Sequence, residues 1–161
     1  MREVTRTSHV DATPEAIWPD LVDGQRFAEW YAFCDEVEEP APGTRVLLGS
    51  WGSQRSAVTT EIVTAEQPTR FAWRHVAEEL DGRPAPAVAI DTTVEVVLEP
   101  AADGGTDVTI TSRQRPRGAV QAIALKLLAR RQLGGMLDQS LDMLAARHDG
   151  RATARGDDEG Q

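Results

Sequence analysis

The order of the first elements is set by a short stretch near the N-terminus, VDATPEAIW, which runs from Val10 to Trp18. The residues before it, from Val4 to Val10, alternate and are rich in Thr and Val, a pattern typical of a strand. Within the stretch, Thr13 has the hydroxyl of a helix cap, and Pro14 has the fixed φ that suits a first helical residue. The stretch therefore predicts a strand that is followed directly by a helix.

Two short helices are predicted here. The first carries an apolar stripe of Ile17, Trp18, Leu21 and Val22, and Pro19 and the Asp23-Gly24 pair keep it short. The second is predicted from Arg26 to Trp30, with Phe27, Trp30 and Tyr31 on one side. Cys34 to Glu38 then begins an extended segment.

Between Pro40 and Gln114 the sequence changes to extended runs that are separated by Gly and Pro. Repeated short strands with turn residues between them predict an antiparallel meander. The predicted strands are Thr44–Gly49, Ser56–Ala65, Arg70–Val76, Val88–Leu98 and Thr106–Gln114. The connection from Glu78 to Pro86 is the least regular and is a candidate gate.

The last large element is predicted to be one helix from Ala119 to Arg147, about 40 Å long at 1.5 Å per residue. Its inward stripe is expected to be Val120, Ile123, Leu127, Gly134, Leu137, Leu141 and Leu144. The Gly134-Gly135 pair predicts either a bend or the close approach of another backbone. We therefore expect one domain over residues 1–148 and a disordered acidic tail over residues 149–161.

Composition narrows the function classes. A formal charge of -9 over 161 residues, with no basic stripe, argues against a nucleic-acid partner. The single Cys34 excludes an internal disulfide and a cysteine metal site, and the N-terminus has no signal peptide or membrane anchor. We expect a cytoplasmic protein with no membrane partner, and either a monomer or a homodimer.

Three segments carry a family resemblance. VDATPEAIW, the later FAEW at 27–30, and the run from Thr60 to Trp73 with its Glu66-Gln67-Pro68 turn resemble the START-like or SRPBCC superfamily, also called the helix-grip or Bet v 1-like fold. Within it the chain looks most like the small bacterial polyketide cyclase/dehydrase branch, over residues 2–148. The resemblance implies an α+β fold of order β-α-α-β5/6-α, in which a curved antiparallel sheet of six to seven strands wraps the long C-terminal helix around an internal apolar cavity.

The same resemblance implies a hydrophobic small-molecule ligand. Members of the superfamily bind lipids, sterols, plant hormones or polyketide intermediates, and some cyclise or dehydrate them. The leading expectation is a cofactor-independent enzyme of secondary metabolism that directs cyclisation or dehydration of a biosynthetic intermediate. The alternatives are a non-catalytic carrier or sensor of a lipid-like or aromatic molecule, and a protein whose groove receives another chain.

His75 is the candidate catalytic residue. It is the one histidine predicted on the inward aromatic face, and an ordinary imidazole titrates near neutrality. The alternative is a histidine that hydrogen-bonds a neighbour or faces solvent. Because His9, His75 and His148 lack metal-ligand spacing, no metal site is expected.

The candidate ligand-binding residues share the predicted inward faces. The aromatic ones either stack on a planar ligand or simply fill the core, and Trp51, in a glycine-flanked loop, is expected to cap the cavity mouth. Arg131 either meets an anionic ligand or stays at the surface. The full set is Trp30, Tyr31, Trp51, Phe71, Trp73, Ile90, Thr92, Val94, Ser112, Gln114, Ile123, Leu127 and Arg131.

Alternation places a second group of charged residues on the outer face of the sheet. Arg74, Glu95, Arg113 and Arg115 are expected to be solvated there. Glu61 and Asp91 become acid candidates for the cavity only if their strands have the opposite register.

Overall fold

The computed structural model describes residues 1–85, 89–120, 123 and 132–149, with the side chains of Trp51, Ala89 and Ile90 left out. The elements in chain order are β1 (Arg2–Val10), α1 (Pro14–Val22), α2 (Gly24–Ala28), β2 (Glu36–Ala41), β3 (Thr44–Trp51), β4 (Gln54–Glu66), β5 (Arg70–Leu80), β6 (Arg83–Pro84), β7 (Ala89–Pro100), β8 (Thr106–Pro116) and α4 (Gly134–Arg147).

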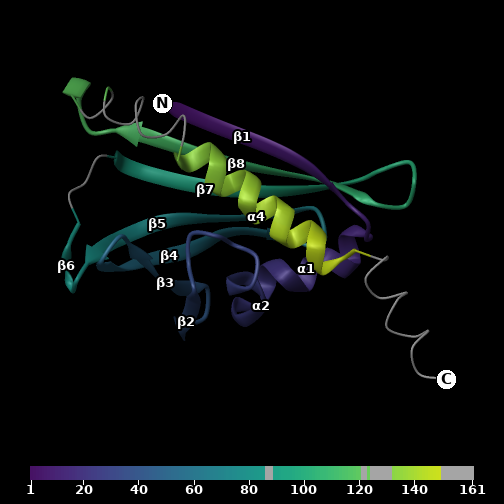
Figure 1. Ribbon diagram of the computed structural model, residues 1–161, viewed down its shortest axis with the longest axis horizontal. Coiled ribbons are helices and arrows are strands. Elements are labelled where there is room, and N and C mark those ends of the chain that lie inside the picture. The colour runs from purple at the N-terminus through teal and green to yellow at the C-terminus, as the bar shows by residue number, and fades with distance from the viewer. Residues whose placement is uncertain (86–88, 121–122, 124–131, 150–161) are drawn as a thin grey trace.

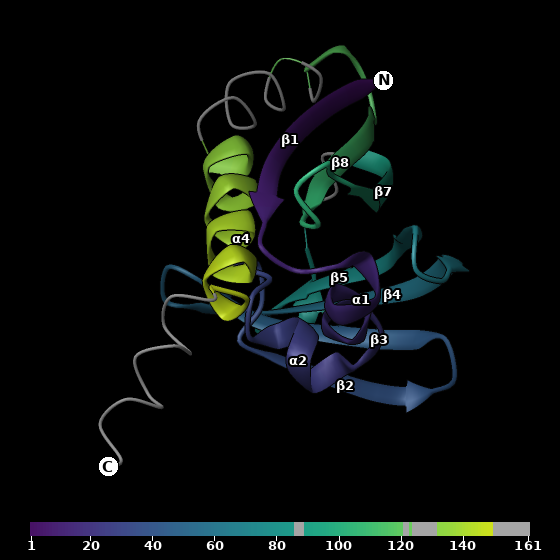
Figure 2. The ribbon, with the colours of Figure 1, turned by 90° about the vertical axis from the view of Figure 1, so that its right-hand side faces the viewer.

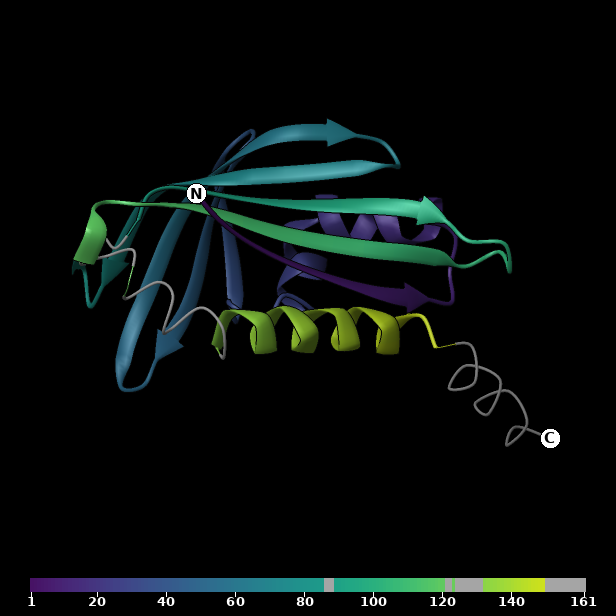
Figure 3. The ribbon, with the colours of Figure 1, turned by 90° about the horizontal axis from the view of Figure 1, so that it is seen from above.

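The strands form one antiparallel sheet in the order β1-β8-β7-β5-β4-β3-β2, and the two-residue β6 pairs with β5 as an eighth strand. Figure 1 shows α4 lying across this sheet, and Figure 2 shows the sheet turning through an arc from β1 to β2. The helices α1, α2 and α4 lie on the concave side, as the view in Figure 3 also shows. The predicted α+β helix-grip architecture is confirmed, with one short strand more than expected.

The N-terminal stretch folds as its sequence predicts. The Thr13 hydroxyl accepts a hydrogen bond from the Ala16 amide at 3.2 Å, and α1 begins at Pro14. Pro19 lies inside α1 without ending it, although a proline at this position cannot donate the usual hydrogen bond to the carbonyl of Glu15. Asp23 ends α1 and caps α2, where its carboxylate accepts from the Gln25 amide at 3.0 Å.

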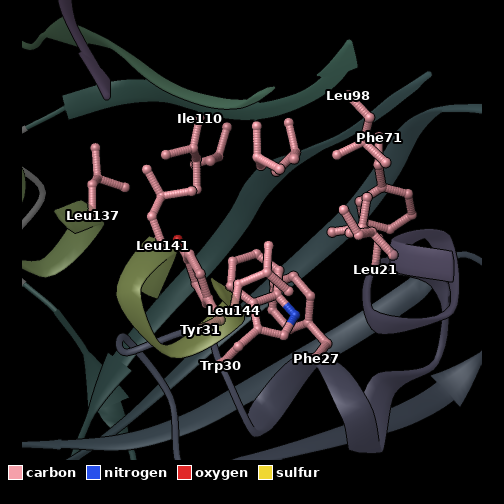
Figure 4. Close-up of a cluster of buried hydrophobic side chains, with 14 of the residues drawn as sticks. Leu21, Phe27, Trp30, Tyr31, Phe71, Leu98, Ile110, Leu137, Leu141 and Leu144 are labelled. Carbon is pink, nitrogen blue, oxygen red and sulfur yellow. The ribbon is translucent and has the colours of Figure 1, made fainter. Parts of the chain in front are cut away.

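The core lies between α4 and the concave face. Leu137, Leu141 and Leu144 of α4 point toward Ile110 of β8 and the aromatic rings near α2 (Figure 4). Full burial of one such leucine stabilises the fold by about 2 kcal/mol. The helix is also fixed by polar contacts, since the Ser140 hydroxyl accepts a hydrogen bond from the Ala32 amide at 2.9 Å.

A buried arginine joins the sheet to the N-terminal helices. The Arg45 guanidinium of β3 donates to the carbonyl oxygens of Leu21, at 2.8 Å, and of Val22. It also lies 5.3 Å from the ring centres of both Phe27 and Phe71. Burial lowers the pKa of Arg45, although the guanidinium stays charged because its ordinary pKa is so high. This contact was not predicted, because strand alternation does not identify a cation that donates to the carbonyl groups at a helix end.

A second polar contact holds the C-terminal end of α4. Asp20 of α1 is 2% exposed, and its carboxylate accepts from Arg147 at 2.9 Å and contacts the His148 imidazole. Arg147 also pairs with Glu29. Partial burial lowers the pKa of Arg147, but its hydrogen bonds to the two carboxylates and their negative charges together outweigh this effect, so its pKa is raised. Residues more than a hundred positions apart in sequence are thereby joined.

Two predictions about the C-terminal region are wrong where the structure describes it. Val120 and Ile123 are 75% and 61% exposed, so neither belongs to the inward stripe, which holds for Gly134, Leu137, Leu141 and Leu144. The Gly134-Gly135 pair was also predicted to permit the close approach of another backbone. At Gly134 it is instead the side chain of Arg6 that approaches, and a Cβ at this position would lie 2.4 Å from Nη2 of Arg6. Leu127, Arg131 and the predicted tail from residue 150 lie outside the described residues.

Two predicted loops are also wrong. The candidate gate from Glu78 to Pro86 is, in its described part, a hairpin in which β5 continues to Leu80 and pairs with β6. Asp81 and Gly82 both have positive φ, 51° and 76°, which fits a tight two-residue turn. Trp51 is the last residue of β3, paired with Gln54, and is not in a loop.

Within the described part of the chain, no helix combines the length and the hydropathy that a bilayer span requires.

Candidate functional site

Polar side chains form a line across the concave face at one level of the sheet. Directly opposed residues in paired strands share a face. Arg2 of β1 pairs with Gln114 of β8, which pairs with Thr92 of β7. On β5, Arg74 pairs with Thr93, so the next residue, His75, lies at the level of Thr92. His75 pairs with Thr60 of β4, and Thr60 pairs with Arg45 of β3. We call Arg2, Gln114, Thr92, His75, Thr60 and Arg45 the polar row.

The contacts of β1 show that this face is the one that α4 covers. Even-numbered residues of β1 are more buried than odd-numbered ones, and Arg6 reaches Asp138 of α4 with Nε 3.3 Å from the carboxylate. Arg2 lies on the same face as Arg6, four residues earlier. One level below the polar row the residues are mainly apolar, namely Val4, Ser112, Val94, Trp73 and Ile62.

The two ends of the polar row differ in how well their hydrogen bonds are satisfied. At the β3 end, Arg45 has its carbonyl partners, and the Thr60 hydroxyl donates to the Arg45 carbonyl at 3.1 Å. Buried polar groups with complete partners stabilise a fold and leave nothing for a ligand. This end is structural.

At the β1 end, the side chains of Arg2, Gln114 and Thr92 make no hydrogen bond to any described residue. The same is true of the Ser112 hydroxyl one level below. Nε of Arg2 is fully shielded from solvent and still lacks an acceptor. Unsatisfied buried polar groups are costly in a folded protein, so this end of the polar row, unlike the β3 end, has polar groups that no described residue satisfies and that a ligand could bind.

His75 has an acidic partner that alternation did not predict. Its Nδ1 lies 2.7 Å from Oε1 of Glu78, and the imidazole is 21% exposed. A regular strand would put residues 75 and 78 on opposite faces. Thr59 and Thr60 pair with Ala77 and His75, so Val76 is an extra residue in β5, and this bulge brings Glu78 to the side of His75.

The charge state of this pair follows from the hydrogen bond. The bond from His75 lowers the pKa of Glu78, against a smaller opposing effect of burial, so Glu78 is a carboxylate at neutral pH. A carboxylate only accepts hydrogen bonds, so Nδ1 of His75 carries the proton. In a neutral imidazole Nε2 is then the basic nitrogen, which suits proton transfer.

The predicted aromatic residues Trp30, Tyr31, Phe71 and Trp73 are all core residues. Trp73 packs edge to face against Phe27 and Tyr31, with ring centres 5.2 Å and 5.3 Å apart. Its indole Nε1 is buried and has no hydrogen-bond acceptor.

The space beside Trp73 is smaller than the apolar cavity that the sequence led us to expect. It is lined by Trp73, Phe27, Arg45 and neighbouring residues of β3 to β5, and its volume is about 170 Å³ including its opening to solvent. It is too narrow to hold a water molecule, whereas ligand sites are typically about 300–1,000 Å³. Among the described residues, the β1 end of the polar row is therefore the better candidate site.

Trp30 and Trp73 provide a paired stability prediction. Nε1 of Trp30 donates to the Asp20 carbonyl at 2.8 Å, whereas Nε1 of Trp73 has no acceptor. Trp30→Phe removes buried volume and a satisfied hydrogen bond, while Trp73→Phe removes similar volume and an unsatisfied donor. We expect Trp30→Phe to lower the free energy of unfolding by about 1–2 kcal/mol more than Trp73→Phe. Urea denaturation of both variants checks this, and equal losses would contradict it.

The remaining predicted site residues divide into three groups. Val94, Thr92 and Ser112 are buried on the concave face, and Gln114 is half-buried there. Ile123 is exposed, and the side chains of Trp51 and Ile90, with Leu127 and Arg131, are outside the description.

The charged residues that alternation placed on the outer face do lie there, but they form ion pairs, and Glu95 is only 14% exposed. These pairs are Arg74 with Glu61, Arg113 with Glu3 and Glu95, Arg70 with Glu95, and Arg115 with Asp91. Glu61 and Asp91 therefore face away from the concave side.

One histidine lies among acids outside this site. His9 is within 3.4 Å of Asp11, Asp103 and Asp107, and the hydrogen bond with Asp107 is the main cause of its raised pKa. These groups are exposed, and a protonated His9 offsets one of their three negative charges. We assign no role to this cluster.

Comparison with known proteins places the chain in a family. The sequence matches, over residues 1–149, the family described as polyketide cyclase / dehydrase and lipid transport. The chain belongs to this family. Membership supports a fold that binds hydrophobic small molecules and leaves the reaction, if any, undetermined. No curated protein matches the sequence.

Solved structures share the fold at low sequence identity. XoxI from Bacillus cereus is 13% identical with a TM-score of 0.71, and the match covers 94% of this chain and 99% of that one. A START superfamily protein from Mycobacterium smegmatis is 14% identical with a TM-score of 0.69, covering 90% and 97%. The Zhui aromatase/cyclase from Streptomyces sp. R1128 is 16% identical with a TM-score of 0.71, covering 96% and 98%.

Proposed function

We propose that this polyketide cyclase/dehydrase family member binds a largely apolar small molecule on the concave face and directs its cyclisation or dehydration, with His75 as the proton-transfer group. The observation that carries the proposal is the 2.7 Å contact between Nδ1 of His75 and Oε1 of Glu78 on that face. A carboxylate that fixes the tautomer of a histidine leaves the other nitrogen as a base.

Each group at the site has a defined task in a dehydration. Nε2 of His75 takes a proton from the carbon beside a ligand carbonyl, and Glu78 stabilises the imidazolium that forms. As the carbon–carbon double bond forms, the carbon–oxygen bond to the departing hydroxyl breaks, and His75 returns the proton so that water leaves. In a cyclisation, the same base generates the carbanion that attacks a second carbonyl, and the proton goes to the new alkoxide.

The polar groups near His75 provide orientation. Thr92 and Ser112 lie on β7 and β8 with hydroxyls that bond no described residue, so they are available to a ligand carbonyl or hydroxyl. These contacts would hold the ligand with its reacting atoms near Nε2 of His75. Such positioning lowers the entropic cost of reaching the transition state and is a large part of catalysis at a site of this kind.

The second candidate is a carrier, which the lipid-transport part of the family description favours. A carrier returns its ligand unchanged, whereas an enzyme releases a product of different mass.

The test is to incubate the purified protein with an extract of its producing organism and compare small molecules by mass spectrometry before and after. We expect a bound apolar compound and a new product that is lighter by one water or isomeric with its precursor. An unchanged bound compound would support the carrier, and the absence of any bound compound would contradict both functions.

A further inference from the structure

The half-buried cation at the end of the polar row has no acidic partner among the described residues. Most other described arginines are paired with carboxylates, namely Arg6, Arg26, Arg45, Arg70, Arg74, Arg113, Arg115 and Arg147. Arg2 forms no ion pair with any described residue, although the chain has a formal charge of -9 and acids are plentiful. Among the described arginines, the others without an ion pair, Arg55, Arg83 and Arg117, are exposed.

The position of Arg2 shields one of its donors from solvent. Arg2 lies on the face of β1 that α4 covers, opposite Gln114, and its Nε is shielded from solvent without an acceptor. This N–H donor loses its hydration and gains no hydrogen bond in return. A ligand oxyanion would supply the missing acceptor.

We propose that Arg2, with Gln114 beside it, is a subsite for the carboxylate of an amphipathic ligand whose apolar body lies along the concave face. The planar guanidinium matches a carboxylate through paired N–H donors, and the Gln114 amide adds a donor. The inference rests on the proposed function and adds the chemical class of the ligand to it, an organic acid.

The charges around the subsite favour a single negative charge over a phosphate. The nearest other cations of β8, Arg113 and Arg115, lie on the outer face and are paired with Glu3, Glu95 and Asp91. Among the described residues, Arg2 is thus the one cation on this part of the concave face. One guanidinium balances a carboxylate, whereas a phosphate dianion would keep an uncompensated charge in a partly buried site.

The experiment compares dodecanoate with 1-dodecanol, which have the same apolar chain and differ in charge. Binding is measured by isothermal titration calorimetry at pH 7 and low salt, on the full chain. We expect dodecanoate to bind at least tenfold more tightly than dodecanol, since a hydrogen bond to a charged group is stronger than one to a neutral hydroxyl. In Arg2→Met we expect that preference to disappear, with dodecanol affinity unchanged.

The matched control is Arg55→Met, which removes an exposed arginine that has no ion pair with any described residue and lies elsewhere, on β4. It should leave both affinities unchanged, and retained dodecanol binding shows that Arg2→Met is folded. Equal affinities in the wild-type protein, or a preference that survives Arg2→Met, would overturn the carboxylate subsite alone. Failure of the wild-type protein to bind either probe would overturn the proposed function and this inference with it.

Discussion

Replacing His75 by phenylalanine is expected to lower the rate of the chemical step by about a hundredfold or more, because proton transfer by a positioned group contributes about 10²–10⁴. The imidazole is 21% exposed and hydrogen-bonds Glu78 and no other described side chain, so the apolar ring should leave the fold intact. The measurement is the rate of product formation under single-turnover conditions, with the substrate identified from the extract.

Glu78→Gln is the companion variant. It keeps an oxygen that accepts from Nδ1 but removes the charge that stabilises the imidazolium, so we expect a smaller loss, about tenfold to a hundredfold. The control is Glu79→Gln, one residue further along β5, which has no hydrogen bond to His75 and should retain full activity. Full activity in His75→Phe would remove His75 from the reaction and contradict its proposed role as the proton-transfer group.

The largest expected effect on stability belongs to Asp20→Ala. Asp20 is 2% exposed and joins α1 to Arg147 and His148 at the end of α4. Loss of one partner of a buried ion pair costs about 3–5 kcal/mol, and because Arg147 is itself partly exposed and also pairs with Glu29, we expect about 2–3 kcal/mol. Urea denaturation followed by circular dichroism measures the loss.

A surface ion pair on the same helix is the control. Asp138 of α4 is 57% exposed and pairs with Arg6 of β1. Asp138→Ala should lower the free energy of unfolding by less than about 1 kcal/mol, because exposed pairs are screened by solvent. Similar losses of unfolding free energy in the two variants would mean that the contribution of Asp20 to stability does not depend on its burial.

The predicted secondary structure holds where a local pattern determines it. The Thr13 cap, the two short helices, five strands and the inward faces around Trp73, Val94 and Ile110 follow from periodicity and turn residues. The predictions failed where local pattern was a poor guide. Val120 and Ile123 were assigned to an inward stripe by helical spacing, yet they are exposed, because helical period identifies which residues share a face and not whether another element covers that face.

The candidate site could be predicted only in part. His75, Thr92, Ser112 and Gln114 were identified by alternation, and the strand register confirms that they share the concave face. Glu78 was missed because the Val76 bulge shifts its face, and a bulge has no reliable signal in one sequence. Arg2 was missed because its significance depends on its having no ion-pair partner among the described residues, which is a property of the folded chain.

The sequence by itself determined the order of the elements and which side chains of each strand and helix share a face, because capping, turn chemistry and periodicity act within a few residues. Only the tertiary structure decided which of these faces meet. The polar row joins β1, β8, β7, β5, β4 and β3, and the Asp20–Arg147 pair joins the two ends of the chain. The physical reason is that strand register and buried ion pairs arise from long-range packing, so a residue's partner, or its lack of one, is a property of the whole fold.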